Sequence, residues 1–222
     1  MQHTIGLPAA ISGTVAMFLI LTQLACFRSV VIGELIRLYA VQSFLVAGIA
    51  AVVAVTTHAW DLGVLAGVTF LLKVVFLPGY MSSLVRGVSK RVEIPVRINV
   101  TLSLMLAAGV TGLAILVAAR LTETAGVFLP RADLATALAI IFIGFLLAIL
   151  RPNALAQVVA FLTIENGLFF GTVTLAPGLP FVIGMLLLVD VLVAVVVFGV
   201  LVRVLVDGQN SAAIHPFERL IG

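Results

Sequence analysis

Three ionisable residues lie inside apolar stretches of this sequence. Glu165 and Asp190 each lie near the middle of an apolar run, and a short turn at Pro177 and Gly178 joins these two runs. Lys73 lies well inside an earlier run. An ionised side chain at the centre of a bilayer costs roughly 2.5 to 3.5 kcal/mol on insertion scales, so it is kept mainly where it faces protein or water. We therefore expect the three residues to line a pathway for protons or ions.

Proton relay is the chemistry that these residue types favour. The proton affinity of a buried carboxyl changes with the charges around it, so Glu165 can accept a proton through water and pass it on. Asn166 and Thr163 beside it offer hydrogen-bonding groups for a water chain. The alternative is a neutral, hydrogen-bonded carboxyl that only ties two helices together. The same two interpretations apply to Asp190.

The two carboxylates are predicted to lie at the same depth in the membrane. Each is about twelve residues from the turn at Pro177 and Gly178, which at 1.5 Å per residue is roughly 18 Å. Because so short a turn makes the two helices antiparallel neighbours, Glu165 and Asp190 are expected to face the same interior seam. We expect Glu165 to be the more important of the two.

Lys73 is placed too deep in its run to reach the membrane surface easily. We expect it to lie within direct or water-mediated hydrogen-bonding distance of an acidic residue, the alternative being an anchor that extends to the interface. Pro78 follows five residues later and has no N–H, so the Val74 carbonyl loses its helical partner. This change is expected to kink the helix and to supply a polar group near Lys73.

Five further polar or small residues suggest packing or support rather than chemistry. Glu34 and Arg37 are three residues apart, so we expect an intrahelical salt bridge. Gln42 is interpreted as a polar residue that does not titrate but can hold a water molecule. Gly63 and Gly67 form a spacing that favours close packing of helices.

The composition identifies a membrane protein. The chain is 63% hydrophobic and 9% charged, with a mean hydropathy of +1.34, which exceeds what the interior of a soluble domain can bury. Its net charge of +3 fits basic loops between membrane helices, so no nucleic-acid partner is expected. The single cysteine, Cys26, excludes an internal disulfide framework. We expect no metal site, no cofactor and no catalysis by this chain itself.

The elements that position these residues are expected to be membrane-spanning helices. The fold class is an all-α, polytopic transmembrane bundle of about seven helices. The apolar runs lie at 8–26, 30–56, 61–83, 97–119, 132–150, 154–176 and 179–206. Basic residues are concentrated in alternate loops, which predicts an external amino terminus and a cytoplasmic carboxy terminus. The residues expected on the cytoplasmic side are Arg28, Arg86, Lys90, Arg91, Arg97, Arg151, Arg203 and Arg219.

The chain also resembles itself. Residues 28–48 align without gaps with residues 151–171, which pairs Gln42 with Glu165 and Ser43 with Asn166. We predict two parallel three-helix units joined by one helix, related by an axis along the membrane normal. The units are 1–83 and 132–222, and the segment 84–131 holds a basic loop, the linking helix and an external loop.

Four stretches of the sequence carry a family resemblance: RSVVIGELIRLYAVQS, TFLLKVVFLPGYM, TIENGLFFGTVTL and LLLVDVLVAVVVFGVLVRVL. Together they resemble the hydrogenase-4 component E family, membrane subunits of group 4 energy-converting nickel-iron hydrogenases and formate hydrogenlyase-type complexes. The second half also resembles the K subunit of complex I and the C subunit of Mrp-type antiporters. Two membrane glutamates of the K subunit take part in its proton path, and they match Glu165 and Asp190.

The resemblance implies a role and a set of partners. Lys73 would belong to a row of buried lysines and glutamates through a membrane arm. The partners would be antiporter-like subunits, a subunit like the H subunit of complex I and, indirectly, hydrogenase and iron–sulfur subunits, in a prokaryotic inner membrane. Two other functions stay open: a redox-independent Mrp-type cation/proton antiporter or ion-uptake complex, and a purely structural scaffold.

Overall fold

A computed structural model describes residues 6–29, 31–86, 98–124, 130–151, 153–175, 195–196 and 199–200. The elements in these ranges are helices. In chain order they are α1 (Gly6–Arg28), α2 (Ile32–Thr57), α3 (Trp60–Thr69), the π-helix η1 (Phe70–Phe76), α4 (Leu77–Arg86), α5 (Val100–Thr124), α6 (Arg131–Leu150) and α7 (Ala154–Leu175).

Six segments of the described chain are long and apolar enough to cross a membrane. One of them is formed by α3, η1 and α4, which continue one another. The fold is therefore an all-α bundle of membrane-length helices, as predicted. The first six predicted runs correspond to these six segments, whereas the seventh, 179–206, lies almost entirely outside the described residues.

One helix, α5, lies a few residues later in the chain than the predicted run at 97–119. Asn99 caps its first turn, because the Asn99 Oδ1 accepts a hydrogen bond from the Leu102 amide at 2.7 Å. At the other end, Arg120 and Glu123 continue the helix beyond the apolar run and pair at 3.9 Å. Polar groups therefore set both ends of α5, and hydropathy alone does not reveal them.

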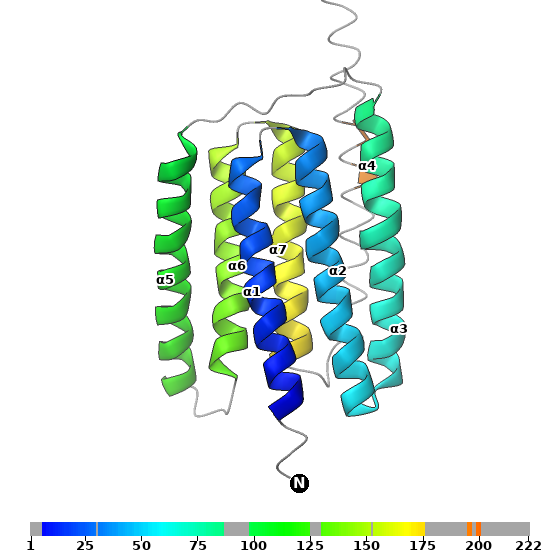
Figure 1. Ribbon diagram of the computed structural model, residues 1–222, viewed down its shortest axis with the longest axis vertical. Coiled ribbons are helices and arrows are strands. Elements are labelled where there is room, and N and C mark those ends of the chain that lie inside the picture. Colours follow the sequence, from blue (N-terminus) through cyan, green and yellow to red (C-terminus); the bar gives the residue numbers. More distant parts are fainter. Residues whose placement is uncertain are drawn as a thin grey trace, which may run out of the picture.

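The most central helix of the bundle is α7 (Figure 1). It packs against α6 and α2, and α1 in turn packs against both α2 and α6. The span of α3, η1 and α4 packs on α2 at one edge of the bundle, while α5 packs on α6 at the opposite edge (Figure 1). Successive spans alternate in direction, so α2 and α7 run the same way (Figure 1). Side chains from α2 and α7 can therefore meet at the same depth.

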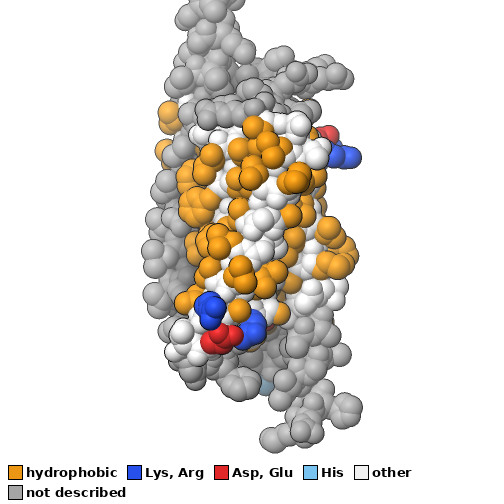
Figure 2. All heavy atoms as spheres, turned by 90° about the vertical axis from the view of Figure 1, so that its left-hand side faces the viewer, with side chains coloured by type: hydrophobic (Ala, Val, Ile, Leu, Met, Phe, Trp, Pro, Cys, Tyr) orange, Lys and Arg blue, Asp and Glu red, His pale blue; other side chains and the backbone are white. Residues whose placement is uncertain are grey.

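Burial distinguishes α7 from α5. In the membrane-length window of α7, 72% of the residues are buried, against 22% in α5. Figure 2 shows the α5 side of the molecule, where a broad apolar surface ends in a group of charged side chains. An apolar face bounded by charge is what a lipid-facing helix presents. The helix α7 instead faces protein almost all round, so polar side chains on it can be buried without meeting lipid.

Close helix packing occurs between α6 and α7. A Cβ atom added to Gly144 would approach Ile164 Cγ1 to 2.5 Å, so this position admits no larger residue without movement. The pair that the sequence suggested for close packing is less constrained. A Cβ on Gly63 would meet Ala54 at 3.8 Å, and one on Gly67 would meet nothing within 4 Å. Within the described chain, Gly67 is not used for close packing.

Two apolar clusters occupy opposite halves of the bundle. On α2 the first cluster includes Tyr39 and the second includes Val46; on α7 the first includes Leu162 and the second Phe169. Buried polar side chains lie between the two clusters on four different elements. We call this set the polar layer; its members are Gln23, Gln42, Ser43, Lys73, Thr163, Glu165 and Asn166.

Candidate functional site

The centre of the polar layer is an ion pair. The Lys73 Nζ lies 2.7 Å from the Glu165 Oε1, and the two side chains are only 3% and 7% exposed. The prediction that Lys73 lies beside an acidic residue is confirmed. The alternative, an anchor extended to the membrane interface, is wrong for this lysine.

The ammonium of Lys73 has a second electrostatic neighbour. It lies 5.8 Å from the centroid of the Phe169 ring, which attracts cations through its π face. Phe169 follows Glu165 by four residues on α7, so the carboxylate and the ring share one face of that helix. One helix therefore supplies both groups that stabilise the buried cation.

The backbone that carries Lys73 is a π-helix. The Leu77 amide donates to the Leu72 carbonyl, five residues back, in place of the α-helical partner four residues back. Pro78 follows directly after this amide. The disturbance that the sequence predicts at Pro78 is thus present, and it takes the form of one widened helical segment. π-Helical segments are rare in proteins, and those that do occur are often found at functional sites.

A chain of hydrogen bonds joins three helices beside the ion pair. The Gln23 Nε2 donates to the Thr163 Oγ1 at 3.1 Å, and the Gln42 Nε2 donates to the Gln23 Oε1 at 2.7 Å. The Asn166 Nδ2 donates to the Gln42 Oε1 at 3.3 Å and to the Ser43 Oγ at 3.0 Å. The chain therefore links α1, α2 and α7 through neutral polar groups.

The polar layer crosses the bundle sideways. It begins at Gln23 on α1, passes Gln42 on α2 and Asn166 on α7, and ends at Lys73 in η1. Asn166 follows Glu165 directly in the chain, so the hydrogen-bonded groups and the ion pair adjoin on α7. Apolar clusters lie on both sides of the layer along the membrane normal. This arrangement can move charge between helices more readily than from one membrane surface to the other.

Tyr39 adds a buried hydroxyl beside the layer. The side chain is fully buried, and it interacts electrostatically with Ser43 and Glu165. Among the described residues its hydroxyl has no hydrogen-bond partner of good geometry. Sequence reasoning missed Tyr39 as well as Gln23. For Tyr39 a signal existed, because Tyr39, Gln42 and Ser43 are spaced by three and four residues and so share one helix face.

The remaining predicted site residues are Glu34, Arg37, Gln42 and Asp190, and their predictions have different outcomes. Glu34 and Arg37 are both exposed, and among the described ion pairs none joins them, so the predicted salt bridge is wrong. An exposed pair of this kind gains little from contact, which leaves both side chains free to stay in solvent. Gln42 is buried and bonded to protein groups on both sides. Asp190 lies outside the described residues, so its depth and its contact with Glu165 stay predictions.

One basic residue expected in a cytoplasmic loop is buried. Arg151 is 1% exposed, and its Nη2 donates to the carbonyls of Phe27 at 2.6 Å and Cys26 at 3.3 Å. These carbonyls belong to the last turn of α1, where a cation is favoured by the helix dipole. Burial lowers the pKa of the Arg151 guanidinium, although arginine keeps its charge at neutral pH. Arg151 therefore clamps the end of α6 to the end of α1.

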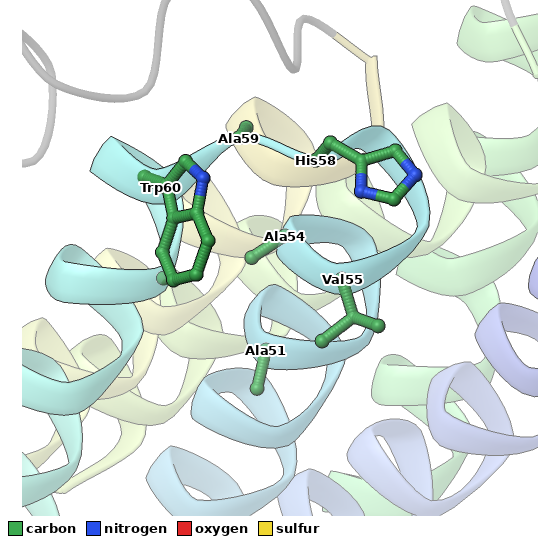
Figure 3. Close-up of a pocket in the computed structure, with 7 residues that line it drawn as sticks. Ala51, Ala54, Val55, His58, Ala59 and Trp60 are labelled. Atoms are coloured by element: carbon green, nitrogen blue, oxygen red, sulfur yellow. The ribbon is translucent and has the colours of Figure 1, made fainter.

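A pocket lies apart from the polar layer, at the turn between α2 and α3 (Figure 3). Its volume is about 320 Å³, and small apolar side chains form most of its wall. Trp60, on its rim, is 88% exposed, and His58 adopts a left-handed backbone conformation with φ 55°. Lys73 is thirteen residues after Trp60 on the same span, which is roughly 20 Å at 1.5 Å per residue. The pocket therefore contributes nothing to the ion pair.

Comparison with known proteins identifies no relative. No family model, no curated protein and no solved structure matches this chain.

Proposed function

We propose that this chain is a non-catalytic membrane-arm subunit of a complex I-like energy-converting oxidoreductase, of the group 4 nickel-iron hydrogenase or formate hydrogenlyase type. The observation that carries the proposal is the Lys73–Glu165 ion pair, buried at mid-depth in a bundle of membrane-length helices. A lysine and a carboxylate at this depth are expensive, and such residues mark proton and ion pathways in membrane proteins. The resemblance to the hydrogenase-4 component E family supplies the type of complex.

Glu165 is the proton carrier in this proposal. As a carboxylate it holds the Lys73 ammonium; when it binds a proton it becomes neutral, and the ammonium is released from its pair. Loss of that proton to the next acceptor restores the pair. Because separating two buried charges is costly, the position of Lys73 and the protonation of Glu165 are coupled, and they titrate as one unit. A change of charge in a neighbouring subunit can drive this step by attracting or repelling the lysine.

The direction of the polar layer supports transfer between subunits. The layer reaches across the bundle from α1 to η1, while apolar clusters cover it along the membrane normal. Gln42 and Asn166 support the path by hydrogen bonding and carry no charge themselves. Asp190 is proposed as a further carrier on the following segment. The partners are antiporter-like subunits and a subunit like the H subunit of complex I, in a prokaryotic inner membrane.

The test is a charge-neutral substitution in the assembled complex. Glu165→Gln keeps the size and hydrogen bonding of the side chain but removes its titration. We expect the complex still to assemble, with lower stability because Lys73 loses its partner, and to lose ion movement, measured as proton uptake by inverted membrane vesicles during turnover. The matched control is Glu34→Gln, the same chemical change at an exposed site, which should leave ion movement unchanged. Wild-type ion movement by a fully assembled Glu165→Gln complex would contradict the proposal.

A structural scaffold is the second candidate. The hydrogen bonds from Gln23 to Thr163 and from Asn166 to Gln42 tie three helices together, as a scaffold requires. In that case Glu165→Gln would leave ion movement intact and lower the stability of the complex. Co-purification of the partner chains would separate a hydrogenase complex from an Mrp-type antiporter, since only the first contains nickel-iron and iron–sulfur subunits.

A further inference from the structure

We infer that Pro78 is the residue that aims Lys73 at Glu165, by fixing the π-helical register of η1. Its consequence for ion movement rests on the proposed function, whereas the geometry stands independently of it. The inference makes Pro78 a positioning residue, since it lies on the same span as Lys73 but reaches the ion pair only through the backbone.

The hydrogen-bond pattern explains why the proline has this effect. In an α-helix the amide of residue 78 would bond to the carbonyl of Val74, but proline has no amide hydrogen and its ring collides with that carbonyl. A π-helix moves each partner by one residue, as the bond from the Leu77 amide to the Leu72 carbonyl shows. The π segment ends at Phe76, directly before Leu77 and Pro78. The altered register is thus located where the proline requires it.

The register determines which side chain faces α7. One residue of an α-helix turns the chain by about 100°, so losing the extra residue of a π segment rotates the helix on one side of it by about that angle. Thr69 before the segment and Leu77 after it are both buried and so anchor the span at each end. Within η1, Lys73 is the one buried side chain. The π register therefore positions chiefly one group, and that group is the partner of Glu165.

An α-helical register would leave the pair broken. The other six residues of η1 are half-buried or exposed, so they offer little packing that would resist a rotation. Turned by this angle, the Lys73 ammonium would leave both the Glu165 carboxylate and the Phe169 ring. An ammonium directed at lipid without a partner is unfavourable, because hydrocarbon does not solvate the charge. Pro78 disfavours this state because its ring would collide with the Val74 carbonyl in an α-helical register.

Cysteine crosslinking tests the geometry without any assay of function. Cysteines replace Lys73 and Glu165 in a Cys26→Ser chain, and a short membrane-permeant bis-methanethiosulfonate reagent joins them where they face each other, each cysteine thiolate displacing methanesulfinate. We expect the crosslink with Pro78 and its loss in Pro78→Ala. Gly79→Ala is the matched control: it also raises helix propensity, its new Cβ meets nothing within 4 Å, and it leaves Pro78 in place. Gly79→Ala should keep the crosslink.

A second cysteine pair reports whether the bundle is intact. Ser43 and Asn166 are in hydrogen-bonding contact on α2 and α7, and neither residue belongs to η1, so cysteines there should crosslink in every background. An undiminished 73–165 crosslink in Pro78→Ala would overturn the inference, and so would its loss in Gly79→Ala. Loss of both crosslinks in Pro78→Ala would show that the proline supports the whole fold and would also overturn the specific role. Failure of the Glu165→Gln transport test would refute the proposed function and leave these crosslinks unaffected.

Discussion

The Lys73–Glu165 pair shows what each residue contributes at the smallest scale. Two opposite charges 2.7 Å apart and almost fully buried depend on each other, because neither has solvent to replace its partner. Removing one leaves an uncompensated charge, whereas removing both leaves only a packing change. A variant that removes one charge should therefore lower the stability of the chain more than a variant that removes both. This comparison tests the pair without knowledge of the complex.

We predict that Lys73→Met lowers stability strongly and that the double variant with Glu165→Gln recovers most of it. Breaking a buried pair by removing one partner costs about 3–5 kcal/mol, and the double variant removes the cause of that penalty. Thermal unfolding of the purified chain in detergent measures both. Arg37→Met is the control, since Arg37 is exposed and should tolerate the change. A Lys73→Met chain as stable as the wild type would contradict the pairing.

Sequence reasoning found the charged residues of the site and missed several neutral ones. Lys73 and Glu165 are conspicuous because a charge within an apolar run is costly. Gln23 and Tyr39 are cheaper to bury and so give a weaker signal. The sequence predicted an acidic partner for Lys73 but not which one, because helix rotation decides which carboxylate the lysine meets.

At the scale of the elements, hydropathy predicts the spans and local chemistry decides their details. Each of the six apolar runs within the described residues corresponds to a helix because an unpaired backbone polar group is unfavourable in lipid. The π-helical form of η1 was not predictable in the same way. Pro78 indicates a disturbance, but a kink and a π segment can both accommodate a missing amide, and the sequence does not distinguish between them.

The contact between α6 and α7 yields a prediction about packing. Gly144→Val should lower the stability of the chain by about 1–3 kcal/mol, since inserted groups in a packed interface force side chains and backbone apart. Gly144 has no room for a larger side chain, because a Cβ at this position would lie 2.5 Å from Ile164 Cγ1. Gly112→Val on α5 is the matched control, because nothing lies within 4 Å of its added Cβ. Equal stability of the two variants in a thermal unfolding experiment would show that α6 and α7 are less closely packed than the structure indicates.

For the whole molecule, the described structure establishes the helical bundle but not its direction in the membrane or its internal repeat. Both stay predictions, since orientation depends on insertion and the second unit extends beyond the described residues. In the alignment of 28–48 with 151–171, Ser43 corresponds to Asn166, and these two residues are in contact. This contact does not by itself support a duplication, because two helices that run the same way can bring such residues together without one.

The orientation of the chain in the membrane can be tested at its carboxy terminus. The excess of basic residues in alternate loops predicts an external amino terminus and a cytoplasmic carboxy terminus. Alkaline phosphatase fused after Gly222 should be inactive, because it folds only outside the cytoplasm, and a green fluorescent protein at the same site should fluoresce. The reverse pattern, an active phosphatase and a dark fluorescent protein, would place the carboxy terminus outside.

The burial of α7 has a consequence for how the chain is made. This helix carries Thr163, Glu165 and Asn166, which suit the interior of the bundle and suit lipid poorly. Their partners on α1, α2 and η1 all precede α7 in the sequence, so synthesis from the amino terminus delivers them to the membrane first. The ribosome therefore releases this helix, with its buried polar side chains, only after their partners on α1, α2 and η1 are in place. A rearranged gene that placed α7 first would encode the same contacts but would expose Glu165 to lipid for as long as the rest of the chain took to appear.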